Sequence, residues 1–207
     1  MGFYGDRVFP RVMNALMDTK ETRRVRSEVC APLQGEVLEI GFGTGLNLAH
    51  LPAAVTKLTA VDPLLRGREI AAGRLAASTV PVEFVGLDGQ RLAVDDQSVD
   101  AALSTWTLCS ITDPAAAVSE IARVLRPGGT FHFVEHGRAP DPKVERWQRR
   151  LNGLQQRIAC GCTLTSDIAT VVGSAGMDVE QLDTYYAKGE PKSHGWTYQG
   201  IATPASR

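Results

Sequence analysis

A glycine-rich stretch at positions 39–45 sets the strongest limit on how this chain can fold. It reads Glu39-Ile40-Gly41-Phe42-Gly43-Thr44-Gly45, and it overlaps the end of an apolar segment, residues 35–41, that has the composition of a buried strand. A helix-like segment, residues 46–51, follows. Glycines between a strand and a helix allow a tight turn and let a ligand approach bare backbone amides. The stretch therefore predicts a ligand site at the carboxyl end of a first strand.

Strand-like and helix-like segments alternate along the rest of the chain, which predicts an α/β fold with parallel strands covered by helices. The next strands are expected at residues 57–62, 82–88, 99–106 and 130–136. The longer helices are expected at residues 64–77, 113–125, 143–159 and 165–175. Two late strands, around residues 179–187 and 195–203, would close the sheet.

Composition and charge narrow the class of protein. The 207 residues suffice for one domain with its own core. A net charge of −1 argues against nucleic acid as the main partner, because phosphate contacts need an excess of Lys and Arg. With four cysteines, no signal peptide and no apolar run near the ~20 residues of a membrane span, we expect a cytoplasmic protein without stable membrane insertion. The pair Cys160 and Cys162 alone is weak evidence for a metal, so no metal site is expected.

Acidic residues mark the ends of the first three expected strands: Glu39, Asp62 and Asp88. A carboxylate at the end of the second strand can accept hydrogen bonds from both hydroxyls of a ribose. The Asp88 carboxylate beside Gly89 can accept a hydrogen bond from the exocyclic amine of adenine. The Glu39 carboxylate favours a ligand that carries an ammonium group. Gly45 follows the preceding glycine by two residues, whereas the dinucleotide fingerprint requires three. A ligand with an amino group, a ribose and an adenine but no phosphate is S-adenosylmethionine.

The chain resembles the class I S-adenosylmethionine-dependent methyltransferases in four motifs across residues 35–137: EIGFGTG, VDP, LDGQRLAVDDQSVD and ARVLRPGG. The resemblance implies a Rossmann-like fold, with a seven-stranded, mostly parallel sheet, an antiparallel last strand and helices on both faces. It also implies that the residues in contact with the cofactor are Glu39, Gly41, Gly43, Gly45, Asp62, Pro63, Asp88 and Gly89.

A narrower resemblance connects the chain to the methyltransferase-like thiol S-methyltransferases of animals. It rests on the motifs STWTLCSITD (residues 104–113), RVLRPGGTFHFVEH (residues 123–136) and GCTLTSD (residues 161–167). It implies methyl transfer to the sulfur of a small thiol or sulfide. The hydrophobic N-terminal anchor of the animal proteins is not found in this sequence, which is expected of a soluble relative and leaves the acceptor open.

Methyl transfer to a thiolate cancels the positive charge of the donor and the negative charge of the nucleophile together, so positioning and one modest base suffice. His136 is the candidate base, because it follows the fifth strand at the edge where open α/β sheets bind ligands. The alternative is a strand-end histidine that only bonds a backbone carbonyl. Thr105 is expected beside the cofactor, and the substrate pocket is expected to include Tyr4, Trp106, Cys109 and Thr163. Cys109 alone is also consistent with an ordinary core position.

The expected layout is a single domain with residues 1–34 as a helical lid, 35–137 as the cofactor-binding core, and 138–207 as substrate-side helices and the last two strands. Three alternatives to thiol methylation stay open. One is O- or C-methylation of a quinone-like or lipid-like small molecule. Another is a nicotinamide oxidoreductase, which the glycine spacing disfavours. The last is a non-catalytic protein that senses the cofactor and needs no acceptor pocket. The oligomeric state stays open as well.

Overall fold

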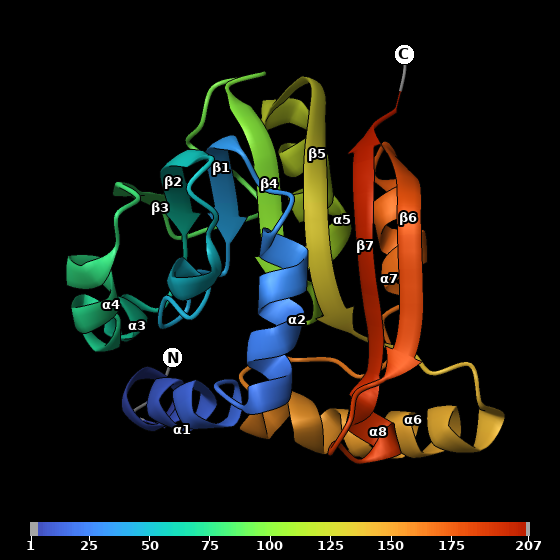
Figure 1. Ribbon diagram of the computed structural model, residues 1–207. Coiled ribbons are helices and arrows are strands. Elements are labelled where there is room, and N and C mark those ends of the chain that lie inside the picture. Colours follow the sequence, from blue (N-terminus) through green and yellow to red (C-terminus); the bar gives the residue numbers. More distant parts are fainter. Residues whose placement is uncertain (1–3, 206–207) are drawn as a thin grey trace.

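A computed structural model describes residues 4–205. The strands within this range are β1 (Gly35–Ile40), β2 (Val55–Val61), β3 (Val82–Gly86), β4 (Val99–Thr105), β5 (Leu125–His136), β6 (Met177–Tyr186) and β7 (Trp196–Pro204). They form one seven-stranded sheet of order β3-β2-β1-β4-β5-β7-β6 (Figure 1). Pairing is parallel from β3 to β5, and β7 is antiparallel to both of its neighbours. The predicted Rossmann-like sheet with an antiparallel last strand is therefore confirmed.

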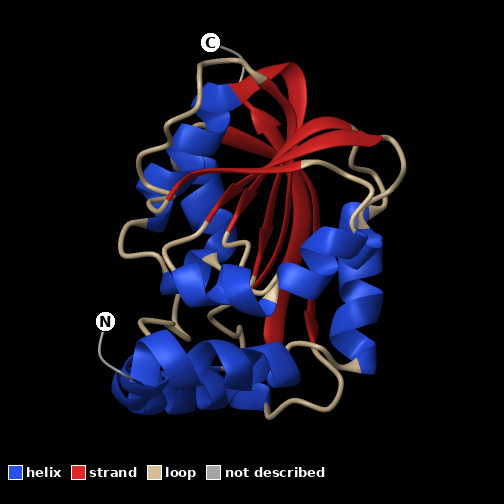
Figure 2. Ribbon diagram, turned by 90° about the vertical axis from the view of Figure 1, so that its left-hand side faces the viewer, coloured by secondary structure: helices blue, strands red, loops and turns tan. Residues whose placement is uncertain are grey.

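Helices cover both faces of the sheet and also its lower edge (Figures 1 and 2). The α-helices described are α1 (Phe9–Leu16), α2 (Lys20–Cys30), α3 (Leu65–Ile70), α4 (Ala72–Ala77), α5 (Pro114–Val124), α6 (Pro142–Ile158), α7 (Ile168–Ser174) and α8 (Lys192–Gly195). Shorter turns are the π-helix η1 (Tyr4–Val8) and the 3-10 helices η2 (Leu48–His50) and η3 (Leu108–Ser110). One core cluster joins α2 to β1 and β2, and a second joins α5 and α7 to β4, β5 and β7.

Local sequence signals explain where α5 begins and ends. The Asp113 side chain caps α5 by accepting a hydrogen bond from the Ala116 N–H (3.0 Å), and Pro114 occupies the first helical position. The helix ends at Val124, just before Pro127 and two glycines that cannot continue it. The predicted capping and termination are both confirmed.

Two helix predictions need correction. The segment 46–51 forms only the 3-10 turn η2, because the Asn47 side chain bonds inward to buried groups and Pro52 prevents a longer helix. The single helix predicted over residues 64–77 is interrupted at Ala71 and forms α3 and α4. Residues 1–3 of the expected lid, and residues 206–207, lie outside the described range.

The carboxyl ends of β1 to β5 meet at one edge of the sheet, above α1 and α6 in Figure 1. This edge is where open α/β sheets bind ligands. Across residues 4–205, no helix combines the length and the apolar character that a membrane span requires.

Candidate active site

A cavity of about 1150 Å³ opens at this edge. It exceeds the roughly 300–1,000 Å³ of common small-molecule pockets, so it has room for a cofactor and an acceptor together. The residues predicted for the site that line it are Tyr4, Gly41, Gly43, Asp62, Pro63, Asp88, Gly89, Thr105, Trp106, Cys109 and His136. Three other predicted residues do not line it: Glu39, Gly45 and Thr163.

The glycine loop after β1 brings its backbone close to neighbouring groups. Gly41 has a φ of +80°, and a Cβ atom there would overlap the Thr107 side chain. The Gly43 N–H donates a hydrogen bond to Asp62 Oδ2 (2.6 Å). Gly45 has a φ of +73°, and a Cβ atom there would lie 2.9 Å from the Phe42 ring. Gly45 therefore permits the packing of the loop, while Gly41 and Gly43 line the cavity.

The two strand-end aspartates differ in their surroundings. Asp62 is buried, and its Oδ1 accepts a hydrogen bond from the Leu64 N–H (2.6 Å). Burial raises the pKa of Asp62 above its ordinary value, and the backbone donors at Gly43 and Leu64 oppose that change. Asp88 is exposed and accepts a hydrogen bond from the Gln90 N–H (2.9 Å). Asp62 is therefore held in a fixed orientation by backbone donors, whereas Asp88 stays open to solvent.

Glu39 lies behind the cavity wall in a buried polar network. The Asn47 side chain, which lines the cavity, donates to Glu39 Oε1 (2.6 Å) and to Thr105 Oγ1 (3.0 Å). The Arg26 guanidinium donates to Asn47 Oδ1 (2.5 Å) and Thr105 Oγ1 (2.9 Å). Burial raises the pKa of Glu39 to about 8 and lowers the pKa of Arg26 to about 10. Direct binding of an ammonium group by Glu39 stays a prediction.

The loop after β4 holds Trp106 in an unusual backbone conformation. Trp106 has a φ of +52°, which an aromatic residue adopts only under strong constraint. Its N–H donates to the Val134 carbonyl (2.8 Å), and the Arg26 guanidinium lies 4.8 Å from its ring centroid. The buried Glu135 carboxylate accepts hydrogen bonds from Ser104 Oγ (2.7 Å) and the Thr107 N–H (2.9 Å). These contacts fix the loop in which Trp106 lines the cavity.

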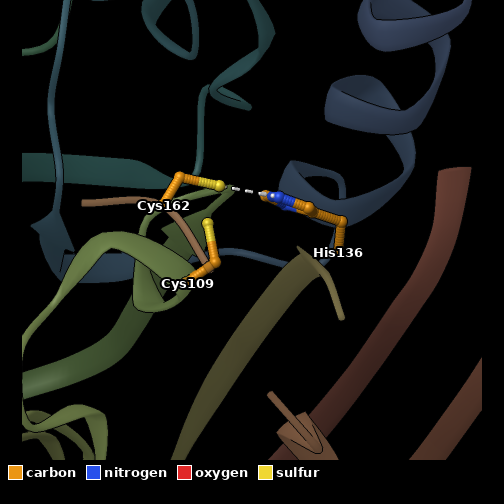
Figure 3. Close-up of side chains that lie close together, drawn as sticks. All are labelled: Cys109, His136 and Cys162. Atoms are coloured by element: carbon orange, nitrogen blue, oxygen red, sulfur yellow. Dashed lines mark hydrogen bonds between the residues drawn. The ribbon is translucent and has the colours of Figure 1, made fainter. Parts of the chain in front are cut away.

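His136, the last residue of β5, lies beside Cys109, which follows β4, and Cys162, which follows α6 (Figure 3). Its Nε2 lies 2.9 Å from Cys162 Sγ, and the three side chains place their donor atoms within 4.8 Å of one another. The Cys109 hydrogen bond and then the His136 ring hold the pKa of Cys162 well below its ordinary value. Burial opposes protonation of His136, but contact with Cys162 raises its pKa overall.

Thr163 supports this cluster from outside the cavity. Its N–H donates to the Cys109 carbonyl (2.8 Å), and its hydroxyl donates to Asn152 Oδ1 (2.9 Å). The Thr163 hydroxyl is hydrogen-bonded to Asn152 of α6, so Thr163 positions the loop that carries Cys162 and does not form the cavity wall.

The N-terminal segment forms part of the cavity wall. The Tyr4 hydroxyl donates to the Ile158 carbonyl at the end of α6 (2.9 Å). Phe9, Val12 and Met13 from α1 line the cavity as apolar side chains. This placement is consistent with the expected lid.

Sequence reasoning missed Arg26 and Asn47 as parts of the site, and it placed Cys162 in a pocket segment, residues 161–165, without its contacts to Cys109 and His136. A signal existed for Arg26, because helical spacing places it on the same face of α2 as Thr22 and Val29, which are buried. Asn47 gave no such signal. Cys162 was paired with Cys160 by sequence proximity, whereas the fold pairs it with Cys109 and His136.

The residues at β1 to β3 suit S-adenosylmethionine. The bare glycine backbone, the oriented Asp62 carboxylate and the exposed Asp88 beside Gly89 line one continuous cavity. Glu39 Oε2 is buried and has no hydrogen-bond partner among the described residues, which provides an acceptor next to the Asn47 amide. The polar groups that line the cavity thus fit the ribose and adenine parts of that cofactor, and contact between Glu39 and its amino group stays a prediction.

Comparison with known proteins supports this assignment. Residues 38–133 match the family model described as "Methyltransferase domain". Thiol S-methyltransferase TMT1B of Rattus norvegicus is 32% identical over 71% of this chain and 62% of its own length. TMT1B of Homo sapiens is 31% identical over 77% of this chain and 70% of its own length. The demethylmenaquinone methyltransferase of Clavibacter sepedonicus is 34% identical over 60% of this chain and 51% of its own length. The chain thus spans about half to seven tenths of these relatives.

A solved structure shows the same fold. N-methyltransferase NodS from Bradyrhizobium japonicum, in complex with S-adenosylhomocysteine, superposes with a TM-score of 0.69 over 93% of this chain and 91% of that chain, at 15% identity. Together with the sequence relatives and the family model, the sheet and its glycine loop show that this chain belongs to the class I S-adenosylmethionine-dependent methyltransferases.

Proposed function

We propose that this chain transfers a methyl group from S-adenosylmethionine to the sulfur of a small thiol. The observation that carries the proposal is the cluster of Cys109, His136 and Cys162 on the wall of the cavity, beyond the cofactor-binding loops. The similarity to thiol S-methyltransferase TMT1B supports the same acceptor.

The strand order separates two ends of the cavity. Loops after β3, β2 and β1 carry the residues that suit adenine, ribose and the amino acid part of the cofactor. Trp106 follows β4, and the Cys109, His136 and Cys162 side chains lie beyond it at β4 and β5. When bound, S-adenosylmethionine supplies an electrophilic methyl group on a sulfonium. Trp106 and Thr105 would border that methyl group, and the cluster would face an acceptor on its other side.

The chain contributes position and exclusion of water. Correct placement of two reactants is worth about 7–11 kcal/mol in favourable cases. Apolar side chains of α1 and the Trp106 indole would keep water from the acceptor sulfur. His136 as the base that removes the thiol proton stays a prediction, and its Nε2 already contacts Cys162. The lid role of residues 1–34 and a cytoplasmic location also stay predictions.

A second acceptor class has its own support. The 34% identity to a demethylmenaquinone methyltransferase, and the mainly apolar lining of a large cavity, favour a quinone-like molecule methylated on carbon. Radiolabelled S-adenosylmethionine, offered with an alkyl thiol, a phenol and a demethylated menaquinone in parallel, separates the two. We expect label in the thioether. Label in the quinone alone would reject the thiol acceptor.

A further inference from the structure

The Cys109, His136 and Cys162 side chains come from three separate segments and still converge. Cys109 lies in η3 after β4, His136 ends β5, and Cys162 lies in the loop after α6 (Figure 3). Cys109 and Cys162 are buried, and His136 is half-buried. Two thiols and one imidazole at one point are more than an acid–base role requires, since one base would suffice.

The geometry of the cluster is close to that of a metal site. The donor atoms lie within 4.8 Å of one another, with His136 Nε2 and Cys162 Sγ only 2.9 Å apart. Tetrahedral zinc, with Zn–S near 2.3 Å and Zn–N near 2.0 Å, requires separations of about 3.5–3.8 Å between its ligands. Shifts of about 1 Å in the side chains would therefore enclose an ion.

The surrounding contacts hold the ligands in place without a metal. The Thr163 N–H fixes the Cys109 carbonyl (2.8 Å), and the Gln155 side chain donates to Cys162 Sγ (3.5 Å). His136 Nδ1 is buried and has no hydrogen-bond partner among residues 4–205, so the ring is not committed to a structural bond on that side. All three ligand side chains line the cavity, so a fourth position would face it.

We propose that Cys109, His136 and Cys162 bind one Zn²⁺ ion, and that its fourth position takes the acceptor thiol as a thiolate. Two cysteines and one histidine with an open position form a ligand set of catalytic zinc sites, and soft thiolates favour zinc over harder cations. This inference rests on the proposed thiol acceptor. It replaces His136 as the base, because a ring nitrogen bound to zinc cannot also accept the thiol proton.

The reaction balances without an oxidant or reductant. On binding, the acceptor thiol releases its proton to water in the cavity, and its sulfur becomes a zinc-bound thiolate. An electron pair of that sulfur forms the new bond to the methyl carbon. The bond between that carbon and the donor sulfonium breaks, and its electron pair stays on the donor sulfur. The products are a neutral thioether, S-adenosylhomocysteine and one proton.

Metal analysis of the purified full chain tests the site. We expect about one zinc per chain in the wild type by elemental mass spectrometry after exhaustive dialysis. Zinc should fall at least about tenfold in Cys109→Ser and Cys162→Ser, as expected when one ligand is lost. The matched control Cys160→Ser, two residues from Cys162, should keep it. Binding of S-adenosylhomocysteine, whose predicted contacts lie on β1 to β3, reports whether each variant is folded.

Cobalt substitution tests the fourth position. In the Co²⁺ form, the cysteine ligands give a thiolate-to-metal absorption band, and an alkyl thiol added with S-adenosylhomocysteine should increase it. A chain that contains no zinc and binds none on reconstitution, while still methylating thiols, would reject the metal site and leave the proposed function intact. A Cys109–Cys162 disulfide in the reductant-free protein, again without zinc, would also reject it. A zinc-loaded chain that methylates no thiol would reject the proposed acceptor instead.

Discussion

At the residue scale, Asp62 and Asp88 carry the same charge in different settings. Asp62 is buried and oriented by two backbone donors, whereas Asp88 is exposed. We expect Asp62→Asn to weaken S-adenosylhomocysteine binding about 10- to 100-fold, because a hydrogen bond to a charged group contributes about 1.5–3 kcal/mol. Asp88→Asn should weaken S-adenosylhomocysteine binding less than about tenfold, since water already surrounds that carboxylate. Isothermal titration calorimetry measures both, and equal losses would contradict the ribose role of Asp62.

His132 gives a residue-scale prediction about acid stability. It is buried on β5, and burial lowers its pKa from 6.5 to about 4. Below pH 6.5 His132 becomes protonated in the unfolded chain, whereas in the folded chain it stays neutral down to about pH 4. The free energy of unfolding therefore falls as the pH drops through this range. Between about pH 7 and about pH 5 this loss amounts to about 2 kcal/mol.

The variant His132→Gln isolates the effect. Urea denaturation of both proteins at about pH 7 and about pH 5 measures how much unfolding free energy each loses on acidification. The variant should lose about 2 kcal/mol less than the wild type, since the two proteins share all other titrating groups. An identical pH dependence in the two proteins would show that folding does not lower the pKa of His132.

At the element scale, Arg26 joins α2 to β1 and β4 through Asn47, Thr105 and Glu39. At about pH 9, where Glu39 with its pKa of about 8 is ionised and Arg26 with its pKa of about 10 is still charged, Arg26→Met should lower the free energy of unfolding by about 2–4 kcal/mol, because two acceptors lose their donor and Glu39 loses its countercharge. Adding Glu39→Gln should recover part of this loss. A double-mutant cycle by chemical denaturation tests the coupling, and strictly additive effects would show that the two charges do not interact.

The predicted lid role of residues 1–34 can also be tested at the element scale. Removing residues 1–12 takes away Tyr4, Phe9 and Val12 from the cavity wall. We expect KM for cofactor or acceptor to rise about tenfold from lost apolar contact. Tyr4→Phe loses only the hydrogen bond to Ile158 and should change KM about fivefold or less. Unchanged turnover and KM after the deletion would reject the lid.

Elements with strong local signals were predictable from sequence. Asp113 and Pro114 define the start of α5, and apolar runs define β1, β2 and β4. The helix expected after the glycine loop was wrong, because the inward bonds of Asn47 depend on tertiary partners that local sequence does not reveal. The break between α3 and α4 at Ala71 likewise left no Pro or cap signal in the sequence.

At the scale of the whole molecule, topology assembles what sequence order separates. Parallel pairing predicts that Gly41, Asp62 and Asp88 share one edge, since all follow strands that run in the same direction. It does not predict that the loop after α6 returns Cys162 to the end of β5, because a long helix separates the two. Sequence therefore named residues on both sides of the cavity, but the contact of Cys162 with Cys109 and His136 required the structure.

A crystal structure with S-adenosylhomocysteine bound is the most direct test of the account. We predict the ribose hydroxyls within hydrogen-bond distance of Asp62, and the thioether sulfur directed past Trp106 toward Cys109, His136 and Cys162. A ribose bound elsewhere, or a sulfur directed away from these three side chains, would contradict it.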